Sequence, residues 1–525
     1  MAARKTPAQV APYPPMQFHS FGEFNQHDQV NEANMLGIAE ALTSSGMAGA
    51  GYDTINVVCN GWVGRNSTTG QLLENHTLWP SGIKGLATKL HAMTPPLKLG
   101  CYTAPREKNC MCNRLWVGGP CEEGTGPGHE AVDMAYFAAS GCDHVMVDMP
   151  DGPATAAAYR ARYQAISDGI RGSSNPDMLF GVWSGPFAYS WKWAADIGGH
   201  YWRIGDDLYD GWQSLMRMWD TLQSIPNIAL RTKPGAYTFL DQMLIGDVPG
   251  RAGTVHGPGL SHDEAVAHMT LWVMAASPLL ACTDPRNMTA SDKAIWMNPE
   301  LLAVHKDPLA QMAIRVDIGG GHEAENANFC SSTYPSCQRL GPDDPGYRGP
   351  CKICRTNSSV WEKALVDNSS AVMVLNRGEA AVEVPVTLFD LSDNTHDSWA
   401  VRDIWQQADL GVAVGSLKVV VPAHGVRLLR MRPHSPPPPR PPPPRPPPPH
   451  PPCPSGFKAH SGGYWHNLHF VATPRTVAEC SAQCVHDCEG FEVFIGKGYP
   501  GDCYIFMHAL TMPFTTAESI TCVKS

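Results

Sequence analysis

Charge is scarce in this sequence. Charged residues make up 17% of the 525 residues, and 39 Lys and Arg are outnumbered by 49 Asp and Glu; soluble proteins average about 25% charged residues. Basic runs are absent, which argues against a nucleic-acid-binding protein, because such proteins must neutralise phosphates. The longest apolar run, Met269–Cys282, is interrupted by Ser277 and Pro278, and a bilayer span needs about 20 residues. We therefore expect no membrane span.

An apolar leader is also lacking, because the first residues, Met1–Pro7, contain no apolar run. Cysteine, in contrast, is abundant: the chain has 17, and disulfides persist in oxidising compartments. Asn-x-Ser/Thr glycosylation motifs occur at Asn66, Asn75, Asn287, Asn357 and Asn368. We predict a secreted, extracellular protein whose leader is not part of this sequence. The odd cysteine count predicts at least one thiol that is free or paired between chains.

Proline is concentrated in one segment. Fifteen of the 47 prolines lie between Pro436 and Pro454, and consecutive prolines favour polyproline II. We expect residues 434–452 to form a stiff linker of about 50 Å. This linker is either a plain spacer or, because it resembles the extensin-type repeats of plant and green-algal wall glycoproteins, a hydroxylated and glycosylated rod. An SH3 or WW ligand is a third interpretation, which fits an exported protein poorly.

The segment after the linker, residues 453–525, has six cysteines, enough for three disulfides of unknown connectivity. Thr476–Glu479 is a capping-box pattern that predicts a short helix, and strands are expected at Glu492–Gly496 and Cys503–Phe506. The segment resembles a PAN/apple module. This resemblance implies a small disulfide-rich α+β unit that binds carbohydrate or wall and matrix glycoproteins.

Residues 311–433 contain short β-branched runs separated by turns, which predict an antiparallel β-sandwich. The runs are Val372–Leu375, Ala381–Leu388, Trp399–Trp405, Leu417–Val421 and Val426–Met431. A Cys-rich insertion, residues 317–356, contains Cys330, Cys337, Cys351 and Cys354. These cysteines fit either two disulfides, which an exported chain favours, or half of a zinc site at the last two.

Residues 1–310 alternate strand-like and helix-like runs. Strands are expected at Met16–Phe21, Thr54–Val58, Lys98–Thr103, His144–Asp148, Met178–Trp183, Tyr201–Ile204, Ala229–Thr232 and Pro278–Cys282. Helices such as Gly82–Met93 and Glu130–Ser140 lie between them. Eight such units predict a (β/α)8 TIM barrel. A doubly wound sheet is the alternative, but no Gly-x-Gly-x-x-Gly follows a strand.

The chemistry of a TIM barrel lies at the carboxyl ends of its strands. Side chains expected there include Cys59, Asn60, Trp62, Tyr102, Asp148, Arg203, Asp206, Asp207, Asp241, Gln242 and Met243. A lone Asp at a strand end is as often a turn or helix-cap residue, and Asp206 and Asp207 could cap the next helix. Two acids from different strands that face one cleft are what glycoside cleavage needs. Asp148 and Asp207 are therefore the candidate catalytic residues.

The order of short motifs resembles glycoside hydrolase family 27, the melibiase or α-galactosidase family. The matching stretches include Pro14–Met16, Trp79–Lys84, Leu97–Tyr102, Gly141–Asp143, Val147–Asp148, Trp202–Arg203, Asp207–Leu208 and Val304–Leu309. They are collinear over nearly the whole barrel region, and the predicted sandwich follows where the family has one. The resemblance implies a glycosidase that requires neither a metal nor an organic cofactor.

Position by position, the resemblance also implies roles. Asp148 matches the nucleophile, and Asp207 the acid/base, of a double displacement with retention. Arg203 matches a residue that helps hold the sugar near its 2-hydroxyl, and Tyr102 matches a pocket tyrosine. Further expected sugar contacts are Trp62, Asp241, Met243, Cys59 and Asn60.

The sugar-recognition positions depart from the family pattern. The resemblance implies two Asp that bind the 4- and 6-hydroxyls of galactose, where this chain has Cys59 and Asn60. The Lys two residues before the nucleophile is Met146, and the Cys two residues after it is Pro150. A hydrogen bond to a charged group contributes about 1.5–3 kcal/mol. Losing several would weaken galactose binding by orders of magnitude.

Two functions are consistent with these residues. The first is a secreted retaining glycosidase that cleaves terminal α-galactosides or a related pyranoside, such as a β-L-arabinopyranoside. The second is a catalytically silent carbohydrate-binding or structural cell-wall glycoprotein on the same scaffold. Thiol chemistry at Cys59 is a third interpretation, although a strand-end Cys is more often half of a disulfide or a core residue.

Overall fold

A computed structural model describes residues 4–21, 29–58, 62–108, 123–149, 155–184, 188–225, 228–247, 257–317, 357–388, 391, 396 and 398–434, with short strands between 330 and 524. The chain divides into two compact units, Met1–Pro436 and Pro437–Ser525, and each is described by itself. The predicted linker and most of the predicted Cys-rich insertion lie outside the described residues.

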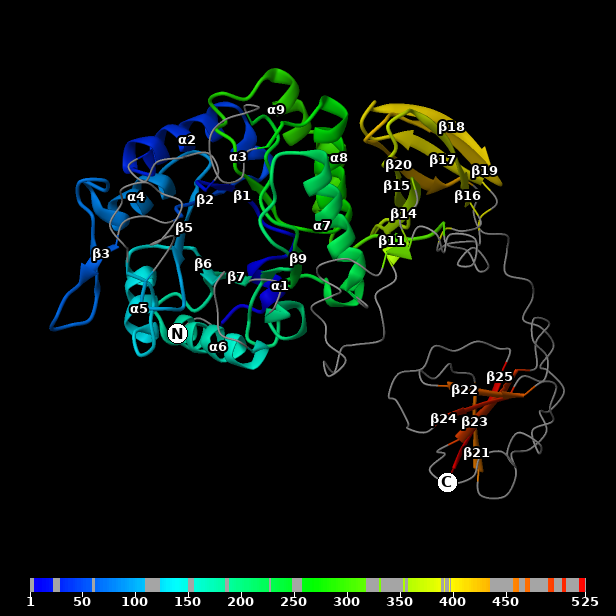
Figure 1. Ribbon diagram of the computed structural model, residues 1–525, viewed down its shortest axis with the longest axis horizontal. Helices are drawn as coiled ribbons and strands as arrows, with labels where there is room; N and C mark the ends of the chain where they lie inside the picture. The colour runs from blue at the N-terminus through cyan, green and yellow to red at the C-terminus, as the bar shows by residue number, and fades with distance from the viewer. Residues whose placement is uncertain are drawn as a thin grey trace. The chain divides into compact units, whose positions relative to one another are not determined.

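Eight parallel strands form a barrel in the first unit (Figure 1). In sheet order they are β10 (Leu279–Ala281), β1 (Met16–His19), β2 (Thr54–Asn56), β5 (Lys98–Thr103), β6 (His144–Met149), β7 (Leu179–Ser184), β8 (Tyr201–Arg203) and β9 (Tyr237–Phe239). The segment after β9 returns to β10, because Met243 N donates to Leu280 O (2.8 Å) and Cys282 N to Met243 O (3.0 Å). The predicted TIM-type barrel is confirmed.

Helices follow most of these strands and surround the barrel in Figure 1. The α-helices among the described residues of this unit are α1 (Pro7–Val10), α2 (Glu32–Ser44), α3 (Met47–Ala50), α4 (Gly82–His91), α5 (Glu130–Ala139), α6 (Ala156–Gly172), α7 (Trp212–Ser224), α8 (His262–Met274), α9 (Ala290–Trp296) and α10 (Pro299–His305). Several begin at a polar cap, for example α6 at Thr155 and α8 at the Ser261–Glu264 capping box. Two single-turn 3₁₀ helices lie at Ser190–Lys192 and Ile228–Arg231.

One predicted strand is wrong. Residues 229–232 belong largely to the 3₁₀ turn Ile228–Arg231, where the Leu230 side chain is 82% exposed, and the seventh strand of the barrel is Tyr237–Phe239. A short apolar run does not distinguish a turn from a strand, whereas Tyr-Thr-Phe has the aromatic and β-branched residues that suit a buried strand.

Alternation along the strands separates an inner and an outer set of side chains. Phe180 and Val182 of β7 pack in the large core that includes the helices, whereas Trp183 joins Tyr201, Phe239 and other residues in a separate cluster inside the barrel. The inward-facing side chains of this second cluster fill the barrel. Only the last inward-facing residue of each strand is therefore available to form a site at the carboxyl end.

The predicted antiparallel sandwich is also confirmed. Its strands among the described residues are β11 (Ile314–Arg315), β14 (Ser358–Ala364), β15 (Ser370–Asn376), β20 (Gly425–Pro433), β17 (Ser398–Asp403), β18 (Ala408–Val414), β19 (Ser416–Val421) and β16 (Val382–Thr387), in sheet order. Val374 of β15, Leu429 of β20, Val386 of β16 and Val421 of β19 share one core. The opposite face of β15 and β20 joins the core of the barrel, where α8 packs against β20.

Three smaller pieces complete the description. β3 (Trp62–Arg65) and β4 (Leu72–Glu74) form a hairpin beside the barrel, and β12 (Cys330–Ser331) pairs with β13 (Ile353–Cys354). The second unit contains a five-stranded sheet in the order β21 (Phe457–Ser461), β25 (Ser519–Lys524), β23 (Gly490–Phe494), β24 (Cys503–Phe506) and β22 (Leu468–Ala472). The strands predicted near 492 and 503 are present, and the helix predicted near 476 lies outside the described residues.

The amino-terminal end of the barrel is covered by residues that precede β1. Tyr237 donates its hydroxyl to Ala11 O (2.9 Å), and His305 Nε2 lies 3.0 Å from Pro14 O. A cavity of about 390 Å³ lies at this end, lined by residues such as Lys5, Tyr13 and Lys98. The cavity is therefore at the end opposite to the predicted site.

Candidate active site

Inward-facing side chains at the carboxyl ends of the barrel strands form the candidate site. Strand pairing places Asp148 of β6 opposite Trp183 of β7, and Arg203 of β8 opposite Phe239 of β9. Asp207 follows β8 by four residues and Asp241 follows β9 by two. The structure therefore brings together five of the predicted site residues: Tyr102, Asp148, Arg203, Asp207 and Asp241.

Asp148 lies in an apolar and partly buried setting. The Tyr102 hydroxyl donates to its Oδ2 at 2.8 Å. Burial raises the pKa of Asp148 to about 6, although the Arg203 charge and the Tyr102 hydrogen bond favour its ionised form. The predicted nucleophile is thus a carboxyl group with one oriented oxygen.

Asp207 has the opposite surroundings. Its Oδ1 pairs with Nη2 of Arg203, and the Arg203 charge lowers the pKa of Asp207 despite partial burial. Arg217 of α7 donates to the Asp207 carbonyl at 2.9 Å. The side chain of Asp207 is 45% exposed, whereas that of its arginine partner is 8% exposed. Asp207 is therefore the member of this ion pair that solvent or a ligand can reach.

Arg203 is shared between two carboxylates. The same Nη2 atom lies 3.3 Å from Oδ2 of Asp241, whose side chain is 2% exposed. The guanidinium carbon also lies 5.6 Å from the centre of the Trp183 ring. Its carboxylate neighbours raise the pKa of Arg203 further, so this group is a permanent cation at the centre of the site.

Sequence reasoning missed a polar cluster beside these groups. His19, at the end of β1, stacks on Trp183 with ring centres 5.0 Å apart, and its Nδ1 lies 3.3 Å from the sulfur of the buried Cys282. Cys282 lies in turn 3.4 Å from Gln242 Oε1. Burial lowers the pKa of His19 to about 3, so its imidazole is neutral. His19 lies inside the expected strand Met16–Phe21, and Cys282 is the last residue of the expected strand Pro278–Cys282, a strand-end position that could have identified it.

Several predicted sugar contacts have other neighbours. The Trp62 indole is buried against Phe137 of α5, and its Nε1 lies 3.5 Å from Tyr102 O. Met243 is fully buried in the main core. Asp241 is 1% exposed, and Cys59 and Asn60 lie outside the described residues. Sugar contact at these positions stays a prediction, and burial argues against it at the first three.

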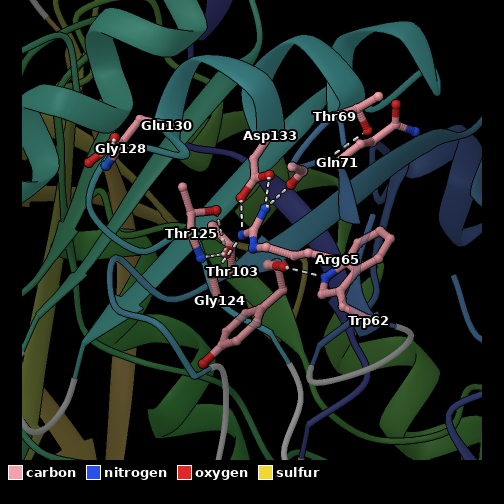
Figure 2. Close-up of polar contacts among 12 residues, drawn as sticks. Trp62, Arg65, Thr69, Gln71, Thr103, Gly124, Thr125, Gly128, Glu130 and Asp133 are labelled. Atoms are coloured by element: carbon pink, nitrogen blue, oxygen red, sulfur yellow. Dashed lines mark hydrogen bonds and ion pairs between the residues drawn. The ribbon is translucent and has the colours of Figure 1, made fainter. Parts of the chain in front are cut away.

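The hairpin that begins at Trp62 is fixed to the barrel by a buried ion pair. Figure 2 shows the guanidinium of Arg65 between the Asp133 carboxylate and the backbone of Gly124. Both N–O distances to Asp133 are 2.7 Å, and Asp133 has no exposed side-chain surface. Bidentate geometry of this kind fixes orientation as well as position. The chain after β2 is therefore held close to Tyr102.

Metal-ligand geometry is not found at this site. Among the described residues, no group of three or more His, Cys, Asp or Glu side chains is arranged to hold a metal ion. The groups that give the site its chemical capacity are one partly buried and one half-exposed carboxyl group, one buried arginine and one tyrosine hydroxyl. Paired carboxyl groups at the mouth of a TIM barrel are the arrangement that glycoside cleavage needs.

Comparison with known proteins leads to the same chemistry. Residues 22–307 match the family model described as alpha galactosidase A, and residues 355–431 match the alpha galactosidase C-terminal beta sandwich domain. The chain belongs to this family, glycoside hydrolase family 27, and is an α-galactosidase-like glycosidase.

Individual relatives span most of both chains. Alpha-galactosidase A of Cellvibrio japonicus is 28% identical over 81% of this chain and 93% of its own length. The structure of α-galactosidase I from Mortierella vinacea superposes with a TM-score of 0.64 at 23% identity, over 80% of this chain and 97% of that one. The structure of a β-L-arabinopyranosidase from Geobacillus stearothermophilus, solved with arabinose, superposes with a TM-score of 0.62 at 19% identity, over 82% of this chain and 100% of that one. The two structures show a shared fold.

Proposed function

We propose that the chain is a secreted retaining glycosidase in which Asp148 is the nucleophile and Asp207 the acid/base. The observation that carries this proposal is the arrangement of two carboxyl groups around Arg203, one oriented by Tyr102 and the other exposed. Asp148 would attack the anomeric carbon while Asp207 protonates the leaving oxygen, and Asp207 would then deprotonate the water that hydrolyses the glycosyl-enzyme.

This assignment requires a change in proton affinity when the sugar binds. In the unliganded protein Asp148 has the raised pKa and Asp207 the lowered one, because Arg203 pairs with Asp207. The mechanism needs the reverse order, an ionised nucleophile and a protonated acid. A sugar hydroxyl that draws the guanidinium of Arg203 away from Asp207 and towards the ring would lower the pKa of Asp148 and raise that of Asp207.

The substrate we propose is a terminal α-galactoside or a pyranoside of the same ring configuration that lacks the 6-hydroxymethyl group, such as a β-L-arabinopyranoside. The Asp pair that the family resemblance implies is replaced by Cys59 and Asn60, so a sugar without the 6-hydroxyl loses less binding here. Met146, in place of the expected Lys, is fully buried in the apolar interior of the barrel.

Secretion is supported by the surface of the first unit. Asn66, Asn287, Asn357 and Asn368 are exposed and Asn75 is half-buried, as glycosylation requires of the acceptor asparagines. A disulfide joins Cys101 and Cys142, which suits an oxidising compartment. Among the described residues, no helix has the length and apolar character of a membrane span. We further propose that residues 453–525, beyond the proline-rich linker, bind wall or matrix glycoproteins.

The test is an assay on aryl α-galactosides and aryl β-L-arabinopyranosides, with Asp148→Asn and Asp207→Asn as matched variants. We expect turnover by the native protein, a loss of about 10³-fold or more in the first variant, and a first-formed sugar that retains the anomeric configuration. Sugar binding by calorimetry without turnover that depends on Asp148 would contradict the enzyme proposal and identify the chain as a silent carbohydrate-binding protein.

A further inference from the structure

Asp241 occupies a backbone position that few residues adopt. Its φ is +80°, in the left-handed region, and its carbonyl accepts a hydrogen bond from Nε1 of Trp272 at 2.8 Å. Non-glycine residues rarely take this conformation, and Asp and Asn are among those that tolerate it. The conformation turns the side chain of Asp241 into the barrel, towards the segment after β8.

The carboxylate of Asp241 contacts two neighbours of the predicted acid/base, namely the backbone of Leu208 and the side chain of Arg203. Oδ2 accepts from the backbone N–H of Leu208, the residue after Asp207, at 2.6 Å, and lies 3.3 Å from Nη2 of Arg203. That nitrogen also pairs with Asp207. Asp241 is 1% exposed. Its carboxylate, for which the sequence analysis predicted a sugar contact, therefore contacts protein groups.

We infer that Asp241 is a positioning residue, which holds Leu208 and Arg203 and thereby sets the orientation and the proton affinity of Asp207. The inference rests on the proposed role of Asp207 as acid/base. Through Leu208 N, Asp241 fixes the backbone from which the Asp207 side chain extends. Through Arg203, it competes with Asp207 for one guanidinium, and this competition keeps the protonated form of Asp207 accessible.

Apart from Asp148, the remaining groups around this cluster are cationic or neutral. The groups that face the cluster from neighbouring elements are Arg203 of β8, Arg217 of α7, His19 of β1, Asp148 of β6 and Arg106 after β5. His19 is neutral because burial lowers its pKa to about 3. Both other arginines add positive charge. Without the Asp241 carboxylate, the balance at Asp207 shifts towards the ionised form, which cannot protonate a leaving group.

Asp241→Asn is the discriminating variant, because asparagine keeps the shape, tolerates the positive φ and can still accept from Leu208 N. Asp220→Asn is the matched control. Asp220 is also 1% exposed and pairs with an arginine, Arg377, at 2.7 Å, but it lies on α7 where the sandwich packs. The two variants therefore remove equivalent buried charges, inside and outside the site.

Two aryl glycosides of the same sugar separate acid catalysis from other effects. A dinitrophenolate leaves without protonation, whereas an unactivated phenol requires it. We expect Asp241→Asn to lose about 10–100-fold in kcat/KM on the phenyl glycoside and only a few fold on the dinitrophenyl glycoside. The alkaline limb of its kcat profile, which reports the sugar-bound enzyme, moves to lower pH, and Asp220→Asn shows neither effect. Equal losses on both substrates, or a rise in KM alone, overturn the inference.

A second measurement does not depend on turnover. The pKa of Asp207 is read from ¹³C-carboxyl-labelled aspartate by NMR titration of the full chain, with Asp207→Asn identifying the resonance. The inference requires a lower pKa of Asp207 in Asp241→Asn than in the native protein and an unchanged pKa in Asp220→Asn; an unchanged pKa in both variants refutes it. If the native protein hydrolyses neither glycoside, the proposed function fails, and the titration still decides the role of Asp241.

Discussion

The charge of Arg203 acts on both Asp148 and Asp207, but the two carboxyl groups differ in how far water reaches them. The pKa of Asp148 is raised because burial disfavours its charge. The pKa of the half-exposed Asp207 is lowered because Arg203 pairs with it. Desolvation and charge pairing are separate causes of a pKa shift. Each can therefore be changed by a different substitution.

Tyr102→Phe tests the hydrogen bond to the nucleophile. The Tyr102 hydroxyl favours the ionised form of Asp148, so its removal raises the pKa of Asp148 above its present value of about 6. A hydrogen bond to a charged group contributes about 1.5–3 kcal/mol, so the acid limb of kcat, which follows Asp148 in the sugar-bound enzyme, moves up by about one pH unit or more. A pH profile that keeps its acid limb would mean that Asp148 is not the group that titrates there.

Asp148→Asn is expected to stabilise the protein at neutral pH. The folded protein holds the pKa of Asp148 at about 6, above its ordinary value of 3.8. Between these values the folded state binds more protons than the unfolded state, so stability falls as pH rises. The variant lacks this titrating group, so its free energy of unfolding exceeds that of the native protein by about 2–3 kcal/mol at pH 7 and equals it near pH 3. Urea denaturation of both proteins at the two pH values measures the difference, and equal gains at both would contradict it.

Residue-scale prediction from the sequence placed Asp148 at the end of a strand, and β6 confirms that position, whereas its catalytic role stays a prediction. Asp148 ends an apolar run and was identified as a site residue on that basis. The partners of Asp241 could not be predicted, because Leu208 and Arg203 lie over 30 positions away and meet it only through the barrel. The same holds for His19 and Cys282, which are 263 residues apart.

At the scale of elements, β5 and the start of β6 are joined covalently. Cys101 of β5 and Cys142, which precedes β6, lie 41 positions apart in sequence and form a disulfide with Cα atoms 5.9 Å apart. These two strands carry Tyr102 and Asp148. The bond thus restrains the elements that hold the predicted nucleophile and its hydrogen-bond donor.

Replacing both cysteines by alanine should lower the free energy of unfolding by about 4 kcal/mol, because the unfolded chain without the cross-link has more conformational entropy. Chemical denaturation under non-reducing conditions measures the loss. Cys282→Ala serves as a control for deleting a buried thiol. Equal stability of the double variant and the native protein would show that the loop is restrained without the bond.

Element-scale prediction succeeded for strands with strong patterns. β5 was predicted to the residue, and β1, β6, β7 and β10 to within two residues at each end. β14 and β18 were missed. Val412 and Val414 of β18 are exposed, and Trp361 of β14 packs against Trp219 of the barrel helix α7. The pattern of these strands is set by tertiary neighbours and not by local alternation.

At the scale of the whole molecule, the barrel and sandwich share a buried interface. Arg402 of the sandwich pairs with Glu300 of α10 at 2.6 Å, and Arg377 pairs with Asp220 of α7. The amine of Lys363, on β14, donates to Val273 O of α8 at 2.9 Å, and burial lowers its pKa to about 7. The two layers are therefore one stability unit, in agreement with the boundary at Pro436.

Truncation after Pro436 should leave this unit intact. The family matches end at residue 431, so a chain that stops at Pro436 keeps every residue that the two family models match. We expect the melting temperature of the first unit and kcat/KM on small aryl glycosides to be unchanged. Binding to wall polysaccharide or glycoprotein is the property that should be lost. A truncated protein that precipitates or loses activity on small substrates would contradict the division into two units.

The pairing of β1 with β10 has a consequence for synthesis. Met16 pairs with Leu279, and the contact between Pro14 and His305 joins residues 291 positions apart. Ribosomes add about 5–20 residues per second, so the first strand emerges on the order of 10–50 seconds before its last neighbour. During that interval the edge of β1 is an open template for other chains. Chaperone demand during translation, more than the stability of the finished barrel, should therefore limit the yield of this protein.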